Sequence, residues 1–165
     1  MKANKAINST IKIIFLCHGN ICRSPMAEFI LRDMAQKRGL AERFEIASAA
    51  TSREELGNPV YPPARAELAR HGISCKGKTA RQVTRADYAH YDLLICMEQY
   101  NVRNLLRLLG GDPEGKVCRL LDFTDRPRDI ADPWYSGDFE TTYDEIVEGC
   151  EALLDKLLEK EGDAR

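Results

Sequence analysis

Residues 11–28 read IKIIFLCHGNICRSPMAE and contain the clearest secondary-structure signals of the chain. Its first part, residues 11–16, is a short apolar run rich in β-branched side chains, which is typical of a buried strand in a parallel sheet. Ser24 followed by Pro25 predicts the beginning of a helix, because a hydroxyl residue before a proline is a common helix start. The sequence therefore predicts a strand, a tight loop over residues 17–23 and a helix, in that order.

Beyond this unit, strand-like and helix-like segments continue to alternate along the chain. We predict further strands at residues 44–48, 91–97 and 117–121, and further helices at residues 64–70, 101–109 and from about 138 onward. Such alternation is typical of an α/β three-layer sandwich, with a central parallel sheet of about four strands and helices on both faces. We expect one domain over residues 11–160 and a flexible N-terminal extension over residues 1–10.

The composition argues against nucleic-acid-binding and membrane-spanning classes of protein. The chain has 165 residues, enough for one domain with a core of its own, and its net charge is -2. That charge favours no nucleic-acid partner, and no apolar run reaches the roughly 18 residues of a membrane-spanning helix. The N-terminal residues also lack the apolar segment of a secretory signal. We therefore expect a cytoplasmic protein without nucleic-acid binding or membrane insertion.

Six cysteines without a secretory signal indicate a reducing compartment, where thiols are packed, catalytic or bound to metal. Cys96, Cys118 and Cys150 lie in apolar patterns and are predicted to be core residues, whereas no role can be assigned to Cys75. Cys17 and the cysteine five positions later form a pair without the second Cys or His pair that a structural zinc site needs. We expect no metal and no cofactor.

The loop after the first strand has the pattern Cys17-x5-Arg23-Ser24. Backbone amides folded around a helix N-terminus point at one centre and, together with the helix dipole, bind an anion such as phosphate. Arg23 adds a planar fork that can hold two oxygens of a phosphate group. The same field stabilises a thiolate at Cys17, which predicts an activated nucleophile beneath a bound phosphorus atom.

The remaining loop residues are expected to shape this anion site. They are His18, Gly19, Asn20, Ile21, Cys22 and Ser24. Gly19 lets the backbone approach the anion closely, and Asn20 is a residue type that tolerates a left-handed conformation. Ser24 has two alternative roles, as a cap of the helix or as a hydrogen-bond donor to the thiolate. For His18, only the backbone amide is expected to contribute.

Residues 123–137 are predicted to form a long surface loop, and they contain the run Asp132-Pro-Trp-Tyr135. A reaction through cysteinyl phosphate needs a proton for the departing oxygen and later a base for water. Asp132 offers a carboxyl group for both steps, beside an aromatic wall formed by Trp134 and Tyr135. An Asp-Pro pair alone is more often only a turn, so the assignment depends on the neighbouring aromatic residues.

These motifs together resemble the low-molecular-weight protein tyrosine phosphatases. Residues 17–28 are similar to the phosphate loop of that family, and residues 132–135 are similar to its general-acid loop. The resemblance implies Cys17 as the nucleophile, Arg23 as the clamp on phosphate and transition state, and Asp132 as general acid and then base. It further implies that Asn20, Ser24 and Ser48 hold the loop, and that the substrate is an aryl phosphomonoester, phosphotyrosine in a protein.

The chain departs from the family pattern at two places. Many members have a histidine just before the Ala-Arg-Gln stretch at 80–82, where this chain has Lys78 or Thr79. Members often have an aromatic residue beside the substrate ring, where this chain has Arg53-Glu-Glu55. Glu54 is therefore predicted to flank the substrate together with Trp134 and Tyr135.

Cys22 is a candidate redox partner of Cys17. Cys22 lies close enough in sequence to trap an oxidised Cys17 as a disulfide, and the alternative is a small side chain packed beneath the loop.

The same fold allows alternative functions. An arsenate reductase of the same fold would need further relay cysteines, and a protein arginine phosphatase tends to have Thr where this chain has Ile21. A phosphopeptide-binding module without turnover, or a thiol redox sensor, would need no general acid such as Asp132.

Overall fold

The computed structural model describes the backbone of residues 9–163 and the side chains of residues 9–160. Its centre is a sheet of four strands in the spatial order β2-β1-β3-β4, and every neighbouring pair is parallel. The strands are β1 (Ile11–Cys17), β2 (Phe44–Ala50), β3 (Leu93–Cys96) and β4 (Val117–Arg119). The predicted parallel sheet of about four strands is therefore confirmed.

β1 lies inside the sheet, which explains its apolar sequence. It pairs with β2 along its whole length and with β3 on its other edge. Ile13, Ile14, Phe15 and Leu16 are completely buried, because one face of the strand packs against each helical layer. A strand buried on both faces reads as a continuous apolar run rather than as an alternating one.

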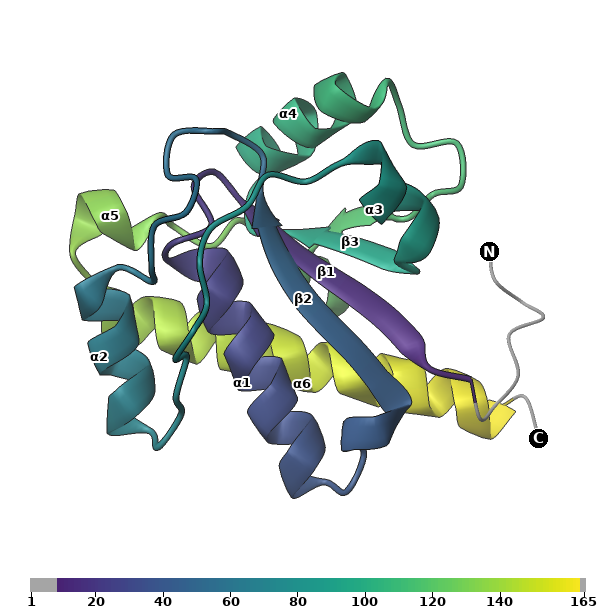
Figure 1. The fold of residues 1–165 in the computed structure, drawn as a ribbon. Coiled ribbons are helices and arrows are strands. Elements are labelled where there is room, and N and C mark those ends of the chain that lie inside the picture. The colour runs from purple at the N-terminus through teal and green to yellow at the C-terminus, as the bar shows by residue number, and fades with distance from the viewer. Residues whose placement is uncertain (1–8, 164–165) are drawn as a thin grey trace.

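Helices cover both faces of the sheet, as predicted (Figure 1). The core on one face joins Ile13 and Phe15 to side chains of α1, α2 and α6, and the core on the other face joins Ile14 and Leu16 to side chains around α3 and α4. The helices are α1 (Arg23–Lys37), α2 (Pro62–Arg70), α3 (Arg85–His90), α4 (Gln99–Leu109), α5 (Pro133–Ser136) and α6 (Phe139–Asp163). Single helical turns lie at η1 (Ala41–Arg43) and η2 (Leu120–Phe123).

Several predicted boundaries differ from the structure. α3 and the short α5 are not predicted from the sequence, and α5 lies inside the predicted loop over residues 123–137. The predicted strand at 117–121 ends at Arg119, because the chain turns there into η2. α1 begins at Arg23 with Cys22 as its N-cap, so the prediction that Ser24 caps this helix is wrong.

The predicted extension over residues 1–10 lies mostly outside the described residues, which begin at residue 9. No helix within the described part of the chain is long and apolar enough to cross a membrane. All six cysteines fall within that part, and each has a free thiol. Cys96 and Cys150 are buried core residues as predicted, whereas Cys118 is only partly buried and packs against the core.

Candidate active site

The predicted phosphate loop connects the end of β1 to the start of α1. Cys17 is the last residue of the strand, and Arg23 is the first residue of the helix. Asn20 has φ 59°, the left-handed conformation expected for it, which lets the chain turn tightly around a centre. A Cβ atom on Gly19 would lie 3.2 Å from Cγ of Glu55, so a larger residue here would push the Glu55 side chain aside.

The thiol of Cys17 lies at the N-terminus of α1 and is almost fully buried. Its Sγ is 3.0 Å from Oγ of Ser24 and 3.4 Å from the backbone nitrogen of the same residue. Both groups of Ser24 can donate to a thiolate, and the helix dipole adds positive potential at the same place. Of the two roles left open for Ser24, the structure supports that of a partner of the thiol.

Asn20 connects this serine to the end of β2. Its side-chain nitrogen donates to Oγ of Ser24 at 2.8 Å and to Oγ of Ser48 at 3.0 Å. Its side-chain oxygen accepts a bond of 3.3 Å from the backbone of Arg81. The three residues that the resemblance assigns to holding the loop, Asn20, Ser24 and Ser48, are therefore joined to each other, and all three are buried.

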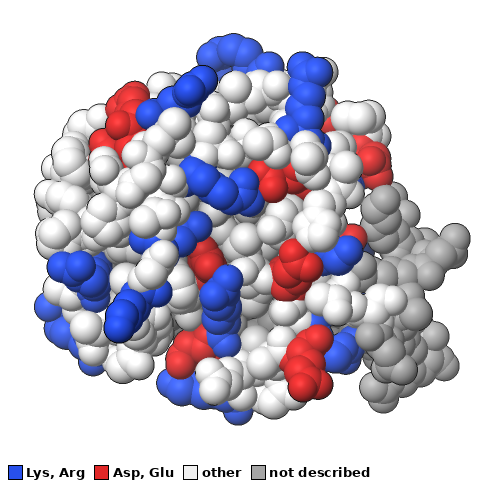
Figure 2. All heavy atoms as spheres, viewed as in Figure 1, with Lys and Arg blue, Asp and Glu red and all other residues white. Residues whose placement is uncertain are grey.

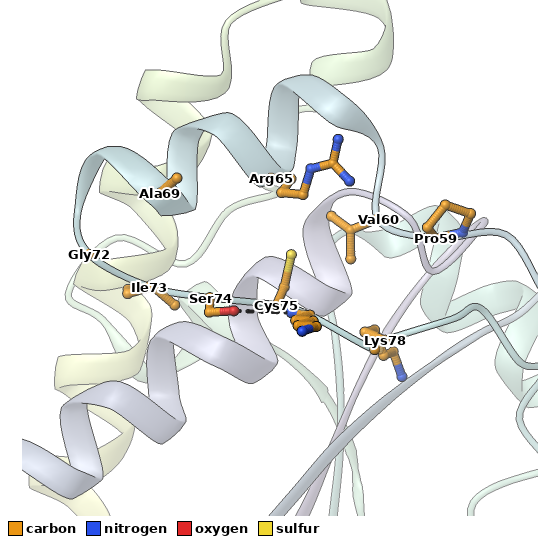
Figure 3. A pocket seen from close by; sticks show the side chains of 11 residues that line it. Pro59, Val60, Arg65, Ala69, Gly72, Ile73, Ser74, Cys75 and Lys78 are labelled. Carbon is orange, nitrogen blue, oxygen red and sulfur yellow. Dashed lines mark hydrogen bonds between the residues drawn. The ribbon is translucent and has the colours of Figure 1, made fainter.

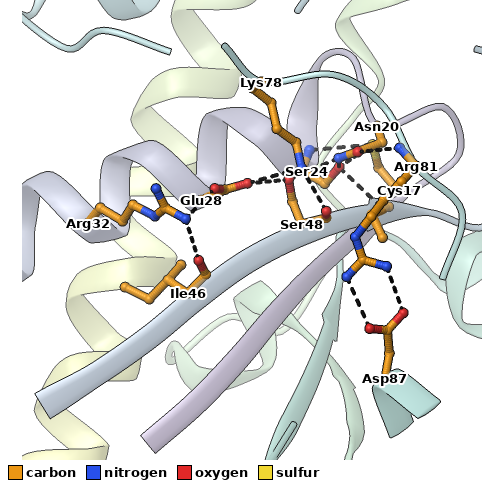
Figure 4. Close-up of polar contacts among 11 residues, drawn as sticks. Cys17, Asn20, Ser24, Glu28, Arg32, Ile46, Ser48, Lys78, Arg81 and Asp87 are labelled. Carbon is orange, nitrogen blue, oxygen red and sulfur yellow. Dashed lines mark hydrogen bonds and ion pairs between the residues drawn. The ribbon is translucent and has the colours of Figure 1, made fainter. Parts of the chain in front are cut away.

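An ion pair between Lys78 and Glu28 contacts this network at Ser48, as Figure 4 shows. Ser48 donates to Oε1 of Glu28 at 2.6 Å, and Lys78 Nζ donates to the carbonyl of Ser48 at 2.8 Å. Lys78 Nζ is also 3.4 Å from Oε1 of Glu28. Burial lowers the pKa of Lys78, although the Glu28 carboxylate opposes that shift. Of the two residues named before the Ala-Arg-Gln stretch, Lys78 contacts this network, whereas Thr79 is exposed.

Arg23 is buried at the floor of the site with its guanidinium bound on several sides. It donates to the carbonyl of Ile130 at 2.8 Å, forms an ion pair with Glu98, and has Nη2 3.4 Å from Oδ2 of Asp132. Burial alone would lower the pKa of Arg23, but the charges of Cys17, Asp132 and Glu98 raise it above its ordinary value. The guanidinium is therefore charged and fixed in orientation before any ligand arrives.

Asp132 caps the short helix α5, since its Oδ1 accepts a bond of 3.0 Å from the backbone of Trp134. This bond orients the carboxylate, and its other oxygen faces Arg23. The Asp-Pro pair therefore forms a turn, as such pairs commonly do, and this turn also orients the Asp132 side chain. It holds a carboxyl group over the loop that contains the thiol.

A pocket of about 370 Å³ brings the predicted residues together. Its lining contains Cys17, His18, Gly19, Ile21, Cys22, Arg23, Glu54, Asp132, Trp134 and Tyr135. Asn20 and Ser24 are not part of the lining and instead hold the loop from beneath. Cys17 and Asp132 are far apart in sequence, and they meet here because the loops after parallel strands gather at one edge of the sheet.

Aromatic side chains form one part of the pocket mouth. Trp134 is 51% exposed and Tyr135 is 86% exposed, so neither is a core residue. The ring of Trp134 packs on Tyr61 with centroids 4.7 Å apart, and Tyr61 in turn lies 6.0 Å from Phe139. These tilted ring contacts hold Trp134 on one side and leave its exposed surface able to receive an aryl ring.

A histidine and an acid form another part of the mouth. Nε2 of His18 is 2.8 Å from Oε2 of Glu54, and the His18 ring lies 6.2 Å from that of Tyr100. The side chain of His18 therefore connects the loop to the turn after β2, a contact that the sequence does not predict. Glu54 lines the pocket as predicted.

Cys22 lies in the same pocket as Cys17, and both thiols are buried. Burial, and then the nearby Cys17 and Asp132, raise the pKa of Cys22. Cys22 therefore stays a neutral thiol while Cys17 is the sulfur that contacts Ser24. No group of three or more His, Cys, Asp or Glu side chains that could hold a metal ion occurs among the described residues.

Cys75 lies in a different cavity, of about 480 Å³, between α2 and residues 72–78 (Figure 3). The lining of this cavity shares no residue with the pocket that contains Cys17. Burial raises the pKa of Cys75, with Arg65 opposing the shift. A buried thiol outside the pocket is not placed to relay oxidation from Cys17, as an arsenate reductase mechanism would require.

Glu55 and Tyr100 line the pocket and Glu98 pairs with the Arg23 guanidinium, but none of the three is predicted from the sequence. Glu98 and Tyr100 follow β3, the neighbour of β1, so the rule that ligands bind beyond the carboxyl ends of parallel strands points to this segment. That rule identifies the segment after β3, but it does not say which of its side chains point toward the site. Their direction depends on where α4 begins.

The fold and the loop define a class of protein. A model of the family described as low molecular weight phosphotyrosine protein phosphatase matches residues 12–164. The chain belongs to this family.

Individual relatives agree with the family match. The chain is 40% identical to the low molecular weight protein-tyrosine-phosphatase YfkJ of Bacillus subtilis, over 87% of this chain and 94% of that protein. It is 38% identical to the low molecular weight phosphotyrosine protein phosphatase of Homo sapiens, over 92% of this chain and 98% of that protein. The crystal structure of YfkJ from Bacillus subtilis superposes with a TM-score of 0.89, at 39% identity over 92% of this chain and 97% of that chain.

Proposed function

We propose that this protein hydrolyses phosphotyrosine in proteins through a cysteinyl-phosphate intermediate. The observation that carries the proposal is the shared pocket of Cys17, Arg23 and Asp132, in which a thiol at a helix N-terminus lies below a carboxylate and beside a buried guanidinium. Family membership supports the same reaction class, a phosphoric monoester hydrolase.

The first step transfers the phosphoryl group to the enzyme. The Cys17 thiolate attacks phosphorus, the bond between phosphorus and the phenolic oxygen breaks, and Asp132 gives its proton to the leaving oxygen. The backbone amides of the loop bind the phosphoryl oxygens, and Arg23 holds two of them through its fork. Ser24 then stabilises the sulfur as a leaving group for the second step, because it lies 3.0 Å from it.

The second step returns the enzyme to its starting state. A water molecule attacks phosphorus, the Asp132 carboxylate takes a proton from that water, and the bond between sulfur and phosphorus breaks. Inorganic phosphate leaves and Cys17 is again a thiolate. In both steps the Arg23 guanidinium stabilises the charge that develops on the phosphoryl oxygens.

The pocket mouth favours an aryl substrate. Trp134 and Tyr135 offer exposed ring faces, and Ile21 supplies an apolar side chain beside the thiol. A guanidino group, as in phosphoarginine, would gain less from these rings and would meet the apolar Ile21. We also propose that Cys22 protects Cys17 by forming a disulfide with it after oxidation.

The test is the hydrolysis of p-nitrophenyl phosphate in the presence of EDTA, with the wild type beside Cys17→Ser and Asp132→Ala. We expect turnover without metal, no turnover by Cys17→Ser, and a fall of about 10²–10⁴-fold for Asp132→Ala, the usual contribution of a general acid. Phosphotyrosine and phosphoarginine peptides then decide the substrate. Phosphopeptide binding by the wild type without turnover would contradict the proposal and favour a binding module.

We also propose the cytoplasm as the location and phosphoproteins as the partners. The six free thiols support a reducing compartment. On the face shown in Figure 2, basic and acidic side chains are interspersed, which supports the expectation that nucleic acid is not a partner.

A further inference from the structure

The acidic part of the pocket mouth has no part in the reaction steps above. It consists of Glu54 and Glu55 in the turn after β2, with His18 of the phosphate loop beside them. Glu54 is mostly solvent-exposed, with a side-chain exposure of 67%. A group that lines the mouth and faces solvent can contact the residues on either side of a bound phosphotyrosine.

Glu54 is held in place although it is exposed. Its backbone nitrogen donates to Oγ of Ser52 at 3.3 Å, and the backbone nitrogen of Ser52 donates to the carbonyl of His18 at 3.0 Å. His18 Nε2 donates to Oε2 of Glu54, because a carboxylate can only accept. The other oxygen, Oε1, has acceptor sites left for a donor from the substrate.

Among the residues that line the pocket, the charge toward solvent is negative, although the exposed Arg53 precedes Glu54 in the same turn. Glu54, Glu55 and Asp132 all line the pocket, whereas Arg23 is 2% exposed and already paired with Glu98 and Asp132. The positive charge of Arg23 thus acts on the phosphoryl group at the floor. The carboxylates of Glu54 and Glu55 instead face the substrate residues beside the phosphotyrosine, at the mouth of the pocket.

We propose that Glu54, positioned by His18, is a specificity-determining residue that favours phosphotyrosine flanked by basic side chains. A lysine or arginine next to the phosphotyrosine would pair with Oε1 of Glu54, and an acidic neighbour would be repelled by the same carboxylate. This inference rests on the proposed phosphotyrosine hydrolysis and adds to it a selection among substrate sequences.

The experiment compares two phosphotyrosine peptides that differ only in having Lys or Glu on both sides of the phosphotyrosine. The measured quantity is the ratio of their kcat/KM values, which does not depend on changes in absolute rate that affect both peptides equally. We expect a wild-type ratio of roughly two- to fivefold in favour of Lys, the range typical of exposed ion pairs. The ratio should fall toward one in Glu54→Gln, invert in Glu54→Lys, and shrink in high salt.

Glu42→Gln is the matched control, because Glu42 is exposed in η1 at the opposite end of β2 from the pocket. It should keep the wild-type ratio. A wild-type ratio of one or below, or a Glu54→Gln ratio equal to that of the wild type, would overturn the inference while leaving phosphotyrosine hydrolysis intact. Failure of the wild type to hydrolyse either peptide would overturn the proposed function and this inference with it.

Discussion

At the level of single residues, the proposed site is supported by side chains that do not line the pocket. Ser24 contacts the thiol, and Asn20 hydrogen-bonds to both Ser24 and Ser48. Ser48 is in turn hydrogen-bonded to Glu28 and Lys78. Each of these groups is satisfied by the next one, so the loss of one partner leaves a buried polar group unpaired.

Lys78→Met tests this chain of contacts. We expect kcat to fall about fivefold, which corresponds to about 1 kcal/mol of lost transition-state stabilisation, because Ser48 loses the donor to its carbonyl. The fall should appear in kcat more than in KM, since the network supports the sulfur rather than the substrate. Steady-state kinetics with p-nitrophenyl phosphate measure it, and Lys76→Met, at an exposed neighbouring lysine, is the control. Equal kcat values for the two variants would show that Lys78 has no positioning role.

Cys22→Ser tests the redox proposal. Peroxide oxidises the Cys17 thiolate to a sulfenic acid, and the Cys22 thiol then attacks that sulfur, forming a disulfide and releasing water. We expect the wild type to regain activity when a thiol reductant is added after peroxide, and Cys22→Ser to regain much less. Activity assays after graded peroxide exposure give the recovered fraction. Recovery of the variant as full as that of the wild type would refute the protective role.

The proposed catalytic residues could be picked out from the sequence because their signal is local. Cys17, Arg23 and the strand and helix around them lie within one short stretch, and Asp132 is marked by its aromatic neighbours. Glu98 and the side-chain role of His18 could not be predicted, because each depends on a partner that only folding brings near. The contact of Lys78 with Ser48 could not be predicted either, because it joins residues 30 positions apart.

At the scale of elements, α3 shows how a short helix is missed and why it still matters. Thr84 and Asp87 form a capping box, in which the Thr84 hydroxyl accepts from the Asp87 backbone and the Asp87 carboxylate accepts from the Thr84 backbone. This Thr-x-x-Asp spacing was the available sequence signal, but a helix of six residues has too few turns for apolar periodicity. The Asp87 carboxylate also receives two bonds from Arg81, whose backbone contacts Asn20 of the phosphate loop.

Asp87→Asn should lower the free energy of unfolding at pH 7 by roughly 1–3 kcal/mol, since it removes a cap and a charge-assisted pair. Burial would raise the pKa of Asp87, but the bonds from Arg81 and Thr84 outweigh burial and lower it below the ordinary 3.8. The contribution of Asp87 is therefore complete above pH 3.8 and is lost as the pH falls through the lower folded-state pKa.

Urea unfolding at a series of pH values checks this expectation. The difference between wild type and Asp87→Asn should be constant from pH 7 down to about pH 4 and should shrink below that. Asp155→Asn makes the same chemical change at a side chain that is 69% exposed, and it should alter stability by less than about 0.5 kcal/mol. A difference that grows as the pH falls would contradict the sign of the Asp87 shift.

At the scale of the whole molecule, the strand order explains why one small loop depends on the entire domain. β1 lies between β2 and β3, so the phosphate loop after β1 is flanked by the turn after β2 and by the segment after β3. The loop before α5 adds Asp132, and the start of α6 supplies Phe139, which packs against Tyr61 beneath Trp134. The alternation of strands and helices in the sequence predicts that the site lies at this edge of the sheet. The order of the strands could not be predicted, because it depends on which strands pair in the folded structure.

Because the pocket draws on segments spread over the whole chain, phosphate should stabilise the domain as one unit. A ligand that binds only the folded state raises the free energy of unfolding by about 2.7 kcal/mol at a concentration one hundred times its Kd. We expect calorimetry in phosphate to show one cooperative transition at a higher Tm than in sodium chloride of equal ionic strength. Arg23→Lys should lose most of that shift, because an ammonium group cannot grip two phosphate oxygens. Arg103→Lys, at an exposed arginine of α4, should keep the shift, and an equal shift in both variants would mean that phosphate acts elsewhere than at the loop.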